Sequence, residues 1–203
     1  MIIKDLGLVD YLPTYEAMQQ FTVHRDQHTE DELWLLEHKA VFTQGLNGKD
    51  EHIFNTNNIP VVNTDRGGQV TYHGPGQLIA YTLVDLKRHG IGVRQMVTLL
   101  ENSVIALLND LGVESQARAD APGVYVGDRK IASLGLKVKR GACYHGVSLN
   151  IDMDLTPFSY INPCGYQGLE IIDLKGLGCD VTMSQVKQQF VSVFTEQINQ
   201  GKK

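Results

Sequence analysis

Three strand-like segments in the second half of the chain, joined by very short turns, constrain the fold most. Segments 123–126, 130–138 and 144–151 are rich in β-branched and apolar residues, with turns at 127–128 and 139–141 between them. Such short turns join antiparallel neighbours, because a parallel pair needs a crossover of a dozen or more residues. The pattern therefore argues against a doubly wound parallel sheet. It predicts an α+β fold around a mixed, mostly antiparallel sheet.

Apolar periodicity predicts three helices around this sheet. The clearest spans about 92–111, where apolar residues recur at helical spacing until Gly112 ends the pattern. A second is predicted over 11–29, and a last one begins at the capping box 182–185. Three further segments are predicted as strands: 32–37, 59–62 and 77–84. The length of 203 residues predicts one single domain over 1–203.

Composition narrows the class of protein. No apolar run approaches the roughly 20 residues that a membrane-spanning helix needs. The first residues carry an acid early and no apolar core, so we expect no signal peptide. Three cysteines, an odd number, do not resemble a disulfide framework and favour a reducing, cytoplasmic location. The pair Cys143 and His145 lacks further ligands at recognisable spacing, so no metal is expected.

A glycine-rich run, Arg66–Gln77, is the first candidate for a binding site. Four glycines and a proline surround the strand-like stretch 69–73. Clustered glycines indicate backbone that adopts unusual angles or approaches a ligand closely. The run lacks Gly-Lys-Ser/Thr and does not open a helix, so it is not a phosphate loop. We interpret it as the wall of a binding site.

Cys164 is the candidate nucleophile. It lies between Pro163 and Gly165, and a turn is a poor place for a cysteine that only fills the core. An unperturbed thiol is only a few per cent ionised at pH 7, so a nucleophilic cysteine needs a cation or base nearby. Lys130, which opens a strand, is the leading candidate for that partner. His73 and His145 are the alternatives, and spacing does not choose among the three.

The charge is unevenly distributed along a chain whose net charge is −5. Residues 129–151 contain five bases and no acid. A hairpin with solvated basic edges is the simpler interpretation, and a docking surface for an acidic partner is the alternative. Nucleic acid is not favoured, because the stretch is short and has no interleaved aromatic residues.

Four motifs together resemble one family. They are Arg66–Gln77, Gly127–Gly135, His145–Asn150 and Pro163–Gly165, in this order and at similar spacing. In combination they resemble the octanoyltransferases of lipoate biosynthesis over about residues 30–175. The resemblance implies the fold of the biotin and lipoate protein ligases, an α+β domain around a mixed sheet.

The resemblance also implies roles and partners. Cys164 would carry an octanoyl group as a thioester, and Lys130 would activate it, with no ATP, cofactor or metal. The donor would be octanoyl-acyl carrier protein. The acceptors would be lysines of lipoyl domains of 2-oxoacid dehydrogenase complexes and of the glycine cleavage H protein, with no nucleic acid or membrane involved. The acyl pocket would be lined by Arg66, Gly67, Gly68, Gln69, Val70, Thr71, Tyr72, His73, Ser133, Leu134, Gly135, Gly146, Val147 and Ser148.

Two departures from the family pattern bear on the acyl chain, and two other functions stay open. Val147-Ser148 stands in place of the usual Leu-Ala, and Tyr144 in place of a common threonine, which could alter the width of the pocket. An ATP-dependent lipoate or biotin ligase of the same fold would form an acyl-adenylate and would not need Cys164. A non-catalytic module would only capture acyl chains or lipoyl domains.

Overall fold

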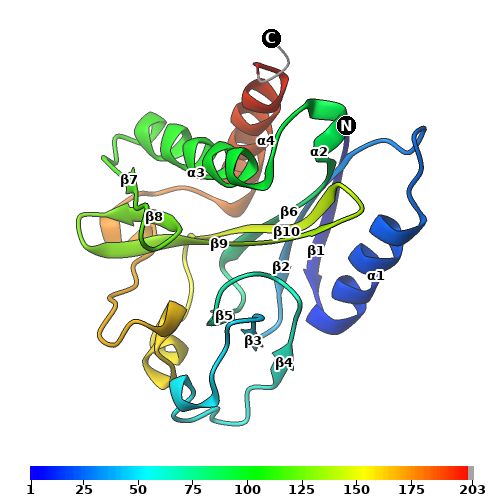
Figure 1. The fold of residues 1–203 in the computed structure, drawn as a ribbon. Coiled ribbons are helices and arrows are strands. Elements are labelled where there is room, and N and C mark those ends of the chain that lie inside the picture. The colour runs from blue at the N-terminus through cyan, green and yellow to red at the C-terminus, as the bar shows by residue number, and fades with distance from the viewer. Residues whose placement is uncertain (201–203) are drawn as a thin grey trace.

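The chain folds as the predicted α+β architecture (Figure 1). The computed structural model describes residues 1–200, without the side chains of Cys164 and Gln200. Its strands are β1 (Ile2–Val9), β2 (Glu32–His38), β3 (Val41–Gln44), β4 (Val61–Asn63), β5 (Val70–His73), β6 (Gln77–Asp85), β7 (Gln116–Ala117), β8 (Gly123–Val126), β9 (Arg129–Lys139) and β10 (Ala142–Asn150). Its α-helices are α1 (Tyr11–His24), α2 (Leu86–His89), α3 (Val93–Asp110) and α4 (Met183–Gln200).

Two sheets organise the molecule. The larger has seven strands in the order β1-β2-β6-β10-β9-β8-β7, and the smaller has the order β4-β3-β5. Only β1–β2 and β3–β4 pair in parallel, and all other neighbours are antiparallel. The predicted mixed, mostly antiparallel sheet is therefore confirmed, with β8, β9 and β10 joined by the short turns that the sequence indicated.

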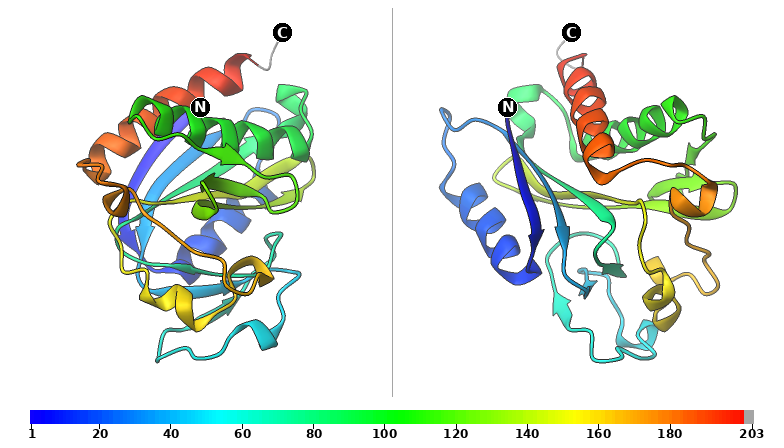
Figure 2. Two further views of the ribbon diagram at one scale, coloured as in Figure 1. Left: turned by 90° about the vertical axis from the view of Figure 1, so that its left-hand side faces the viewer. Right: turned by 180° about the vertical axis from the view of Figure 1, so that it is seen from behind.

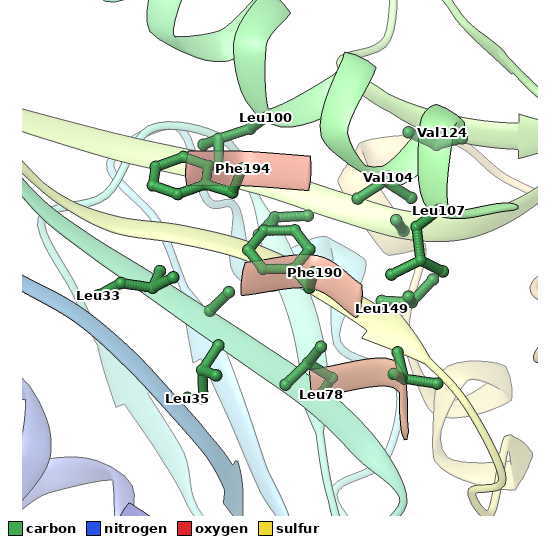
Figure 3. Packing of buried hydrophobic residues seen from close by; sticks show 14 of the residues in the cluster. Leu33, Leu35, Leu78, Leu100, Val104, Leu107, Val124, Leu149, Phe190 and Phe194 are labelled. Atoms are coloured by element: carbon green, nitrogen blue, oxygen red, sulfur yellow. The ribbon is translucent and has the colours of Figure 1, made fainter. Parts of the chain in front are cut away.

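Helices α3 and α4 cover one face of the large sheet and form the main core with it (Figures 1 and 3). Phe190 and Phe194, one helical turn apart on α4, stack with ring centroids 5.8 Å apart. Leucines of α3 and of the strands below surround them, as Figure 3 shows for Leu100, Leu78 and Leu149. Burial of these apolar faces against the sheet provides the main driving force for the docking of both helices.

The opposite face of the large sheet is shared by α1 and the small sheet (Figure 2). Met18 of α1 is fully buried against Trp34, Leu36 and Tyr81 of the sheet. The small sheet has a core of its own around Phe42 and neighbouring aromatic side chains. The space between the two sheets is where the candidate site lies.

Most predicted elements are present, with local differences. Helix α1 ends at His24 instead of residue 29, and Arg25 then pairs with Asp31 at 2.6 Å. Strand β4 begins at Val61, two residues later than predicted. The capping box forms as expected, since Thr182 and Gln185 each accept the other's backbone N–H. Strand β1 was not predicted, because its apolar residues lie at an exposed edge and show no clear alternation.

Candidate functional site

A cavity lies between the large sheet and the strand β5 of the small one, and we call it the inner cavity. Its walls come from β5, β6, β9 and β10 and from the loop before β5. Twelve of the fourteen predicted pocket residues line it: Arg66, Gly68, Gln69, Val70, Thr71, His73, Ser133, Leu134, Gly135, Gly146, Val147 and Ser148. The structure therefore brings together three segments that are far apart in the sequence.

The Arg66 side chain hydrogen-bonds the glycine-rich run to strand β3. The side chain is 8% exposed, and its guanidinium donates to the backbone carbonyls of Thr43 at 2.6 Å and Gln69 at 2.8 Å. The Gly67 N–H donates to the Leu136 carbonyl of β9 at 3.0 Å. A buried arginine that satisfies several carbonyls fixes the shape of the run.

Two predicted pocket residues lie outside the lining of the inner cavity. Side chains of a strand alternate between its two faces, so Tyr72, between Thr71 and His73, points away from the cavity. Tyr72 packs between Phe42 and Phe158 in the core of the small sheet, with ring centroids 5.5 Å from each. It does not line the inner cavity. Gly67 lines a second cavity, described below.

The inner cavity is also lined by four residues that the pocket prediction did not include. They are Tyr11, Ile79, Tyr81 and His145. Tyr11 comes from α1 and Tyr81 from β6, so no local motif connects them with the glycine-rich run. Apolar alternation on β6 places Ile79 and Tyr81 on one face, which is the only signal that sequence offered.

Burial lowers the pKa of three histidines in or beside the inner cavity. It lowers the pKa of His73 to about 3, and that ring bonds Gln77 Oε1 at 2.7 Å. It lowers the pKa of His38 to about 4, and that ring bonds the Tyr81 hydroxyl at 2.7 Å. Burial also lowers the pKa of His145, although its bond to Asp65 at 3.1 Å opposes this.

A second cavity adjoins the first and contains Lys130; we call it the outer cavity. It shares Gly68, Gln69, Leu134 and Gly135 with the inner cavity. Its remaining lining includes Val93 and Val97 of α3 and the segment 120–122. The two cavities therefore adjoin along one common wall.

Lys130 is held rigidly although it begins a hairpin strand. It is 1% exposed, and its ammonium donates to the Pro122 carbonyl at 3.0 Å. The ammonium also lies 5.2 Å from the centroid of the Tyr125 ring, within the range of a cation–π contact. A buried lysine needs such partners, because removing its charge from water is costly. It is therefore not the solvated hairpin lysine that position alone suggests.

The turn Pro163–Gly165, which carries Cys164, packs on the wall that the two cavities share. At Gly165 a Cβ would lie 2.3 Å from the Gln69 side-chain amide, so the turn and Gln69 are in direct contact. The chain then runs to Lys130: the Tyr166 hydroxyl donates to the Asp120 carbonyl at 3.1 Å, and the Lys130 N–H donates to the Glu170 carbonyl at 2.9 Å. The segment that follows the turn thus contacts both Asp120, which lines the outer cavity, and the backbone of Lys130.

The thiol of Cys164 lies outside the described residues, so its role stays a prediction. The candidate partners can nevertheless be compared by position. Lys130 lines the outer cavity, whereas His73 and His145 line only the inner one. This difference in position favours Lys130 as the partner of the cysteine.

Three further features of residues 1–200 concern the Cys143 thiol, metal-ligating side chains and membrane-spanning helices. Burial raises the pKa of the Cys143 thiol to about 11, which makes it a poor nucleophile. No group of three or more potential metal-ligating side chains is found in this part of the chain. Nor does any helix within it have the length and apolar character to cross a membrane.

Comparison with known proteins identifies the family by sequence. Residues 10–195 match the model of the lipoyl protein ligase A/B catalytic domain. The chain is 57% identical over 198 residues to an octanoyltransferase of Marinomonas sp., a match that covers 98% of this chain and 92% of that protein. It is 59% identical over 186 residues to an octanoyltransferase of Nitrosococcus oceani, which covers 92% of this chain and 83% of that protein.

Solved structures share the fold at low sequence identity. A bipartite lipoate protein ligase of Thermoplasma acidophilum, studied with its E2 lipoyl domain, matches with a TM-score of 0.76 and 16% identity, over 98% of this chain and 85% of that one. A biotin protein ligase of Aquifex aeolicus in complex with biotin and ATP matches with a TM-score of 0.66 and 12% identity, over 99% and 72%. The predicted ligase-like fold is therefore confirmed.

Proposed function

The chain belongs to the octanoyltransferases of lipoate biosynthesis, within the family of lipoyl protein ligase A/B catalytic domains, and we propose that it works through an acyl-cysteine. Cys164 receives an octanoyl group from octanoyl-acyl carrier protein and passes it to a lysine of a lipoyl domain. Lys130 serves as its proton partner, and no ATP is used. The reaction takes place in the cytoplasm, where thiols stay reduced.

One observation carries this proposal most directly. Lys130 lines the outer cavity together with Gln69, and Gly165 of the turn that bears Cys164 contacts the side chain of Gln69. A desolvated ammonium beside a thiol favours the thiolate, and the residues that line the inner cavity are the proposed wall for the acyl chain. An adenylate-forming ligase would have no use for a cysteine here.

The first half-reaction exchanges one thioester for another. The Cys164 thiolate attacks the thioester carbonyl of the donor and forms a new C–S bond. The C–S bond to the carrier breaks, and the carrier thiolate takes a proton from the Lys130 ammonium. The second half-reaction forms an amide. The lysine amine attacks the acyl-cysteine, its proton passes to Lys130, and the Cys164 thiolate leaves.

Both tetrahedral intermediates need donors for their oxyanion. Backbone N–H groups along 133–135 are candidates, because this segment lines both cavities, whereas the Gly165 N–H already donates to the Asn162 carbonyl at 2.9 Å. The acceptor domains would be those of 2-oxoacid dehydrogenase complexes and of the glycine cleavage H protein. The lipoyl domain named with the Thermoplasma ligase supports this class of acceptor by analogy.

Intact-mass measurement tests the acyl-cysteine. The protein is incubated with octanoyl-acyl carrier protein without ATP, and we expect one octanoyl adduct that hydroxylamine removes. Cys164→Ser should form none, whereas Cys143→Ser, at a buried thiol, should label like wild type. Lys130→Met should acylate at least about 100-fold more slowly, the usual scale for loss of a general acid–base group.

The outcomes separate the alternatives. Labelling that persists in Cys164→Ser would rule out this cysteine as the nucleophile. A wild-type protein that labels only after ATP and magnesium are added would indicate a ligase. Binding of octanoyl groups without any covalent adduct under either condition would indicate a module that only captures acyl chains.

A further inference from the structure

A buried carboxylate that the proposed mechanism leaves unused lies behind Lys130. Glu101 lies on α3 and is 8% exposed, beside Leu100 and Val104 on the face that packs on the sheet. A charged group on the apolar face of a helix is costly unless it is hydrogen-bonded or paired. Its partners therefore indicate its role.

The Glu101 carboxylate binds the Pro122–Gly123 peptide, and the same peptide binds the Lys130 ammonium. Its Oε1 accepts the Gly123 N–H at 3.0 Å, and the carbonyl of the preceding residue, Pro122, accepts Lys130 Nζ at 3.0 Å. Gly123 has φ +145°, and a Cβ there would lie 2.6 Å from Lys130 Cε. The same short segment thus supplies both the acceptor and the wall against which the end of the lysine side chain rests.

The charges of Glu101 and Lys130 also act on each other. Burial raises the pKa of the Glu101 carboxyl, while the Gly123 N–H and the positive charge of Lys130 lower it. Because the interaction is mutual, the carboxylate stabilises the protonated form of Lys130. The face of the Tyr125 ring acts in the same direction.

We propose that Glu101 is a positioning residue for acyl transfer, which fixes the Lys130 ammonium through the Pro122–Gly123 peptide and favours its protonated form. The inference rests on the proposed function. In the resting enzyme the ammonium partners the thiolate. After Lys130 has given its proton to the departing carrier thiolate, the Glu101 charge makes the neutral amine more basic, so it recovers a proton from the attacking lysine.

Other ionisable groups surround the same lysine and must be considered in any pH profile. Asp120 and Tyr166 line the outer cavity with it, and Tyr125 lies beneath its ammonium. Arg118 stacks on that same ring, 4.7 Å from the centroid. Cys164 is counted with them, because the proposed mechanism pairs its thiol with Lys130. Among these groups only Glu101 is a buried carboxylate.

The test is the pH dependence of self-acylation in Glu101→Gln. Glutamine keeps an oxygen that accepts the Gly123 N–H but has no charge. Without the carboxylate the ammonium loses its proton at lower pH, so the alkaline limb of the pH–rate profile should move down by about one pH unit or more. Glu16→Gln, at an exposed position on α1, removes the same charge as a control.

A second variant keeps the inference falsifiable if Glu101→Gln folds poorly. Glu101→Asp retains the charge, so its alkaline limb should stay within a few tenths of a unit of wild type even if the rate falls. If the alkaline limb of the Glu101→Gln pH–rate profile stays at the wild-type pH, whatever the maximal rate, the proposed role of the Glu101 charge is wrong. An equal shift in Glu101→Asp would lead to the same conclusion. Failure of wild type to acylate at all would instead refute the proposed function.

Discussion

Gly165 joins the turn that carries Cys164 to the wall of the inner cavity. It has φ +77°, which side chains rarely adopt, and a Cβ there would lie 2.3 Å from Gln69 Nε2. Gly168, three residues later, has the same φ of +77° but no atom within 4 Å of an added Cβ. Substitution of Gly168 therefore adds backbone strain alone, whereas substitution of Gly165 adds the same strain and also displaces the turn or Gln69.

We expect Gly165→Ala to lower the rate of self-acylation at least about tenfold, because a displacement of even 1 Å in catalytic geometry can cost more than that. Gly168→Ala should carry the same backbone strain, of about 1 kcal/mol, with little change in rate. Single-turnover acylation and thermal melting measure the two effects. Equal rates in the two variants would show that contact with Gln69 does not position the turn.

Some residues of the candidate site could be nominated from the sequence, and others could not. Cys164 and Lys130 stand in motifs that resemble a family, so both could be named in advance. Glu101 could not, although an acid within the apolar stripe of a predicted helix is a usable signal. Its link to Lys130 passes through the backbone of residues 122–123, and no periodicity reports a contact of that kind.

The packing of α1 on the sheets depends on buried side chains that would carry charge in the unfolded chain. Tyr11 of α1 contacts His38 of β2 and His73 of β5, with ring centroids 5.0 and 6.2 Å apart. Burial lowers the pKa of His38 to about 4 and of His73 to about 3, from an ordinary 6.5. Both rings are therefore neutral in the folded protein across a range in which the unfolded chain binds protons.

This difference predicts acid sensitivity with a definite sign. Above about pH 7 neither state is protonated at these rings, and the full stability is present. As the pH falls through 6.5 the unfolded chain gains protons and the folded one does not, so the free energy of unfolding falls until about pH 4. At pH 5 each histidine costs up to about 2 kcal/mol relative to pH 7.

Urea unfolding at pH 7 and pH 5 measures this loss. His73→Gln should reduce the difference between the two pH values by about 2 kcal/mol, whatever its effect at pH 7 alone. His24→Gln, at an exposed position on α1, controls for the removal of a histidine. An unchanged pH difference in His73→Gln would show that this ring does not account for the acid sensitivity.

At the scale of elements, prediction succeeded where a pattern is local. Helices α3 and α4 follow from apolar spacing, and β8, β9 and β10 follow from short turns. Strand β1 could not be predicted, because apolar and polar residues need not alternate in an exposed edge strand. The packing of α1 on the sheets could not be predicted either, because Tyr11 contacts His38 and His73, which lie far from it in the sequence.

Across the whole molecule, the basic residues are not gathered at the site. Arg129 stands next to Lys130, but Lys139 and Arg140 lie at the turn between β9 and β10. Nine residues of strand separate Lys130 from Lys139, a span of about 30 Å. The basic end of the hairpin therefore lies well beyond a Debye length, about 10 Å at 0.1 M salt, from the reacting groups.

This separation sharpens the hypothesis that the basic hairpin binds an acidic partner. At such a distance the charges can steer the carrier protein toward the enzyme but cannot alter the chemistry at Cys164. Reversal of three charges, with Lys137→Glu, Lys139→Glu and Arg140→Glu, should lower kcat/KM for octanoyl-acyl carrier protein about tenfold at low salt. The difference should shrink as salt rises, and kcat should stay unchanged.

The matching glutamine triple variant distinguishes steering from damage to the hairpin. It removes three positive charges without adding negative ones, so its kcat/KM should fall between wild type and the reversed variant at every salt concentration. If both variants show wild-type kcat/KM and salt dependence, the bases are solvated edges of a hairpin and the carrier docks elsewhere. A fall in kcat that persists at high salt would instead show that the hairpin supports the β10 wall of the inner cavity.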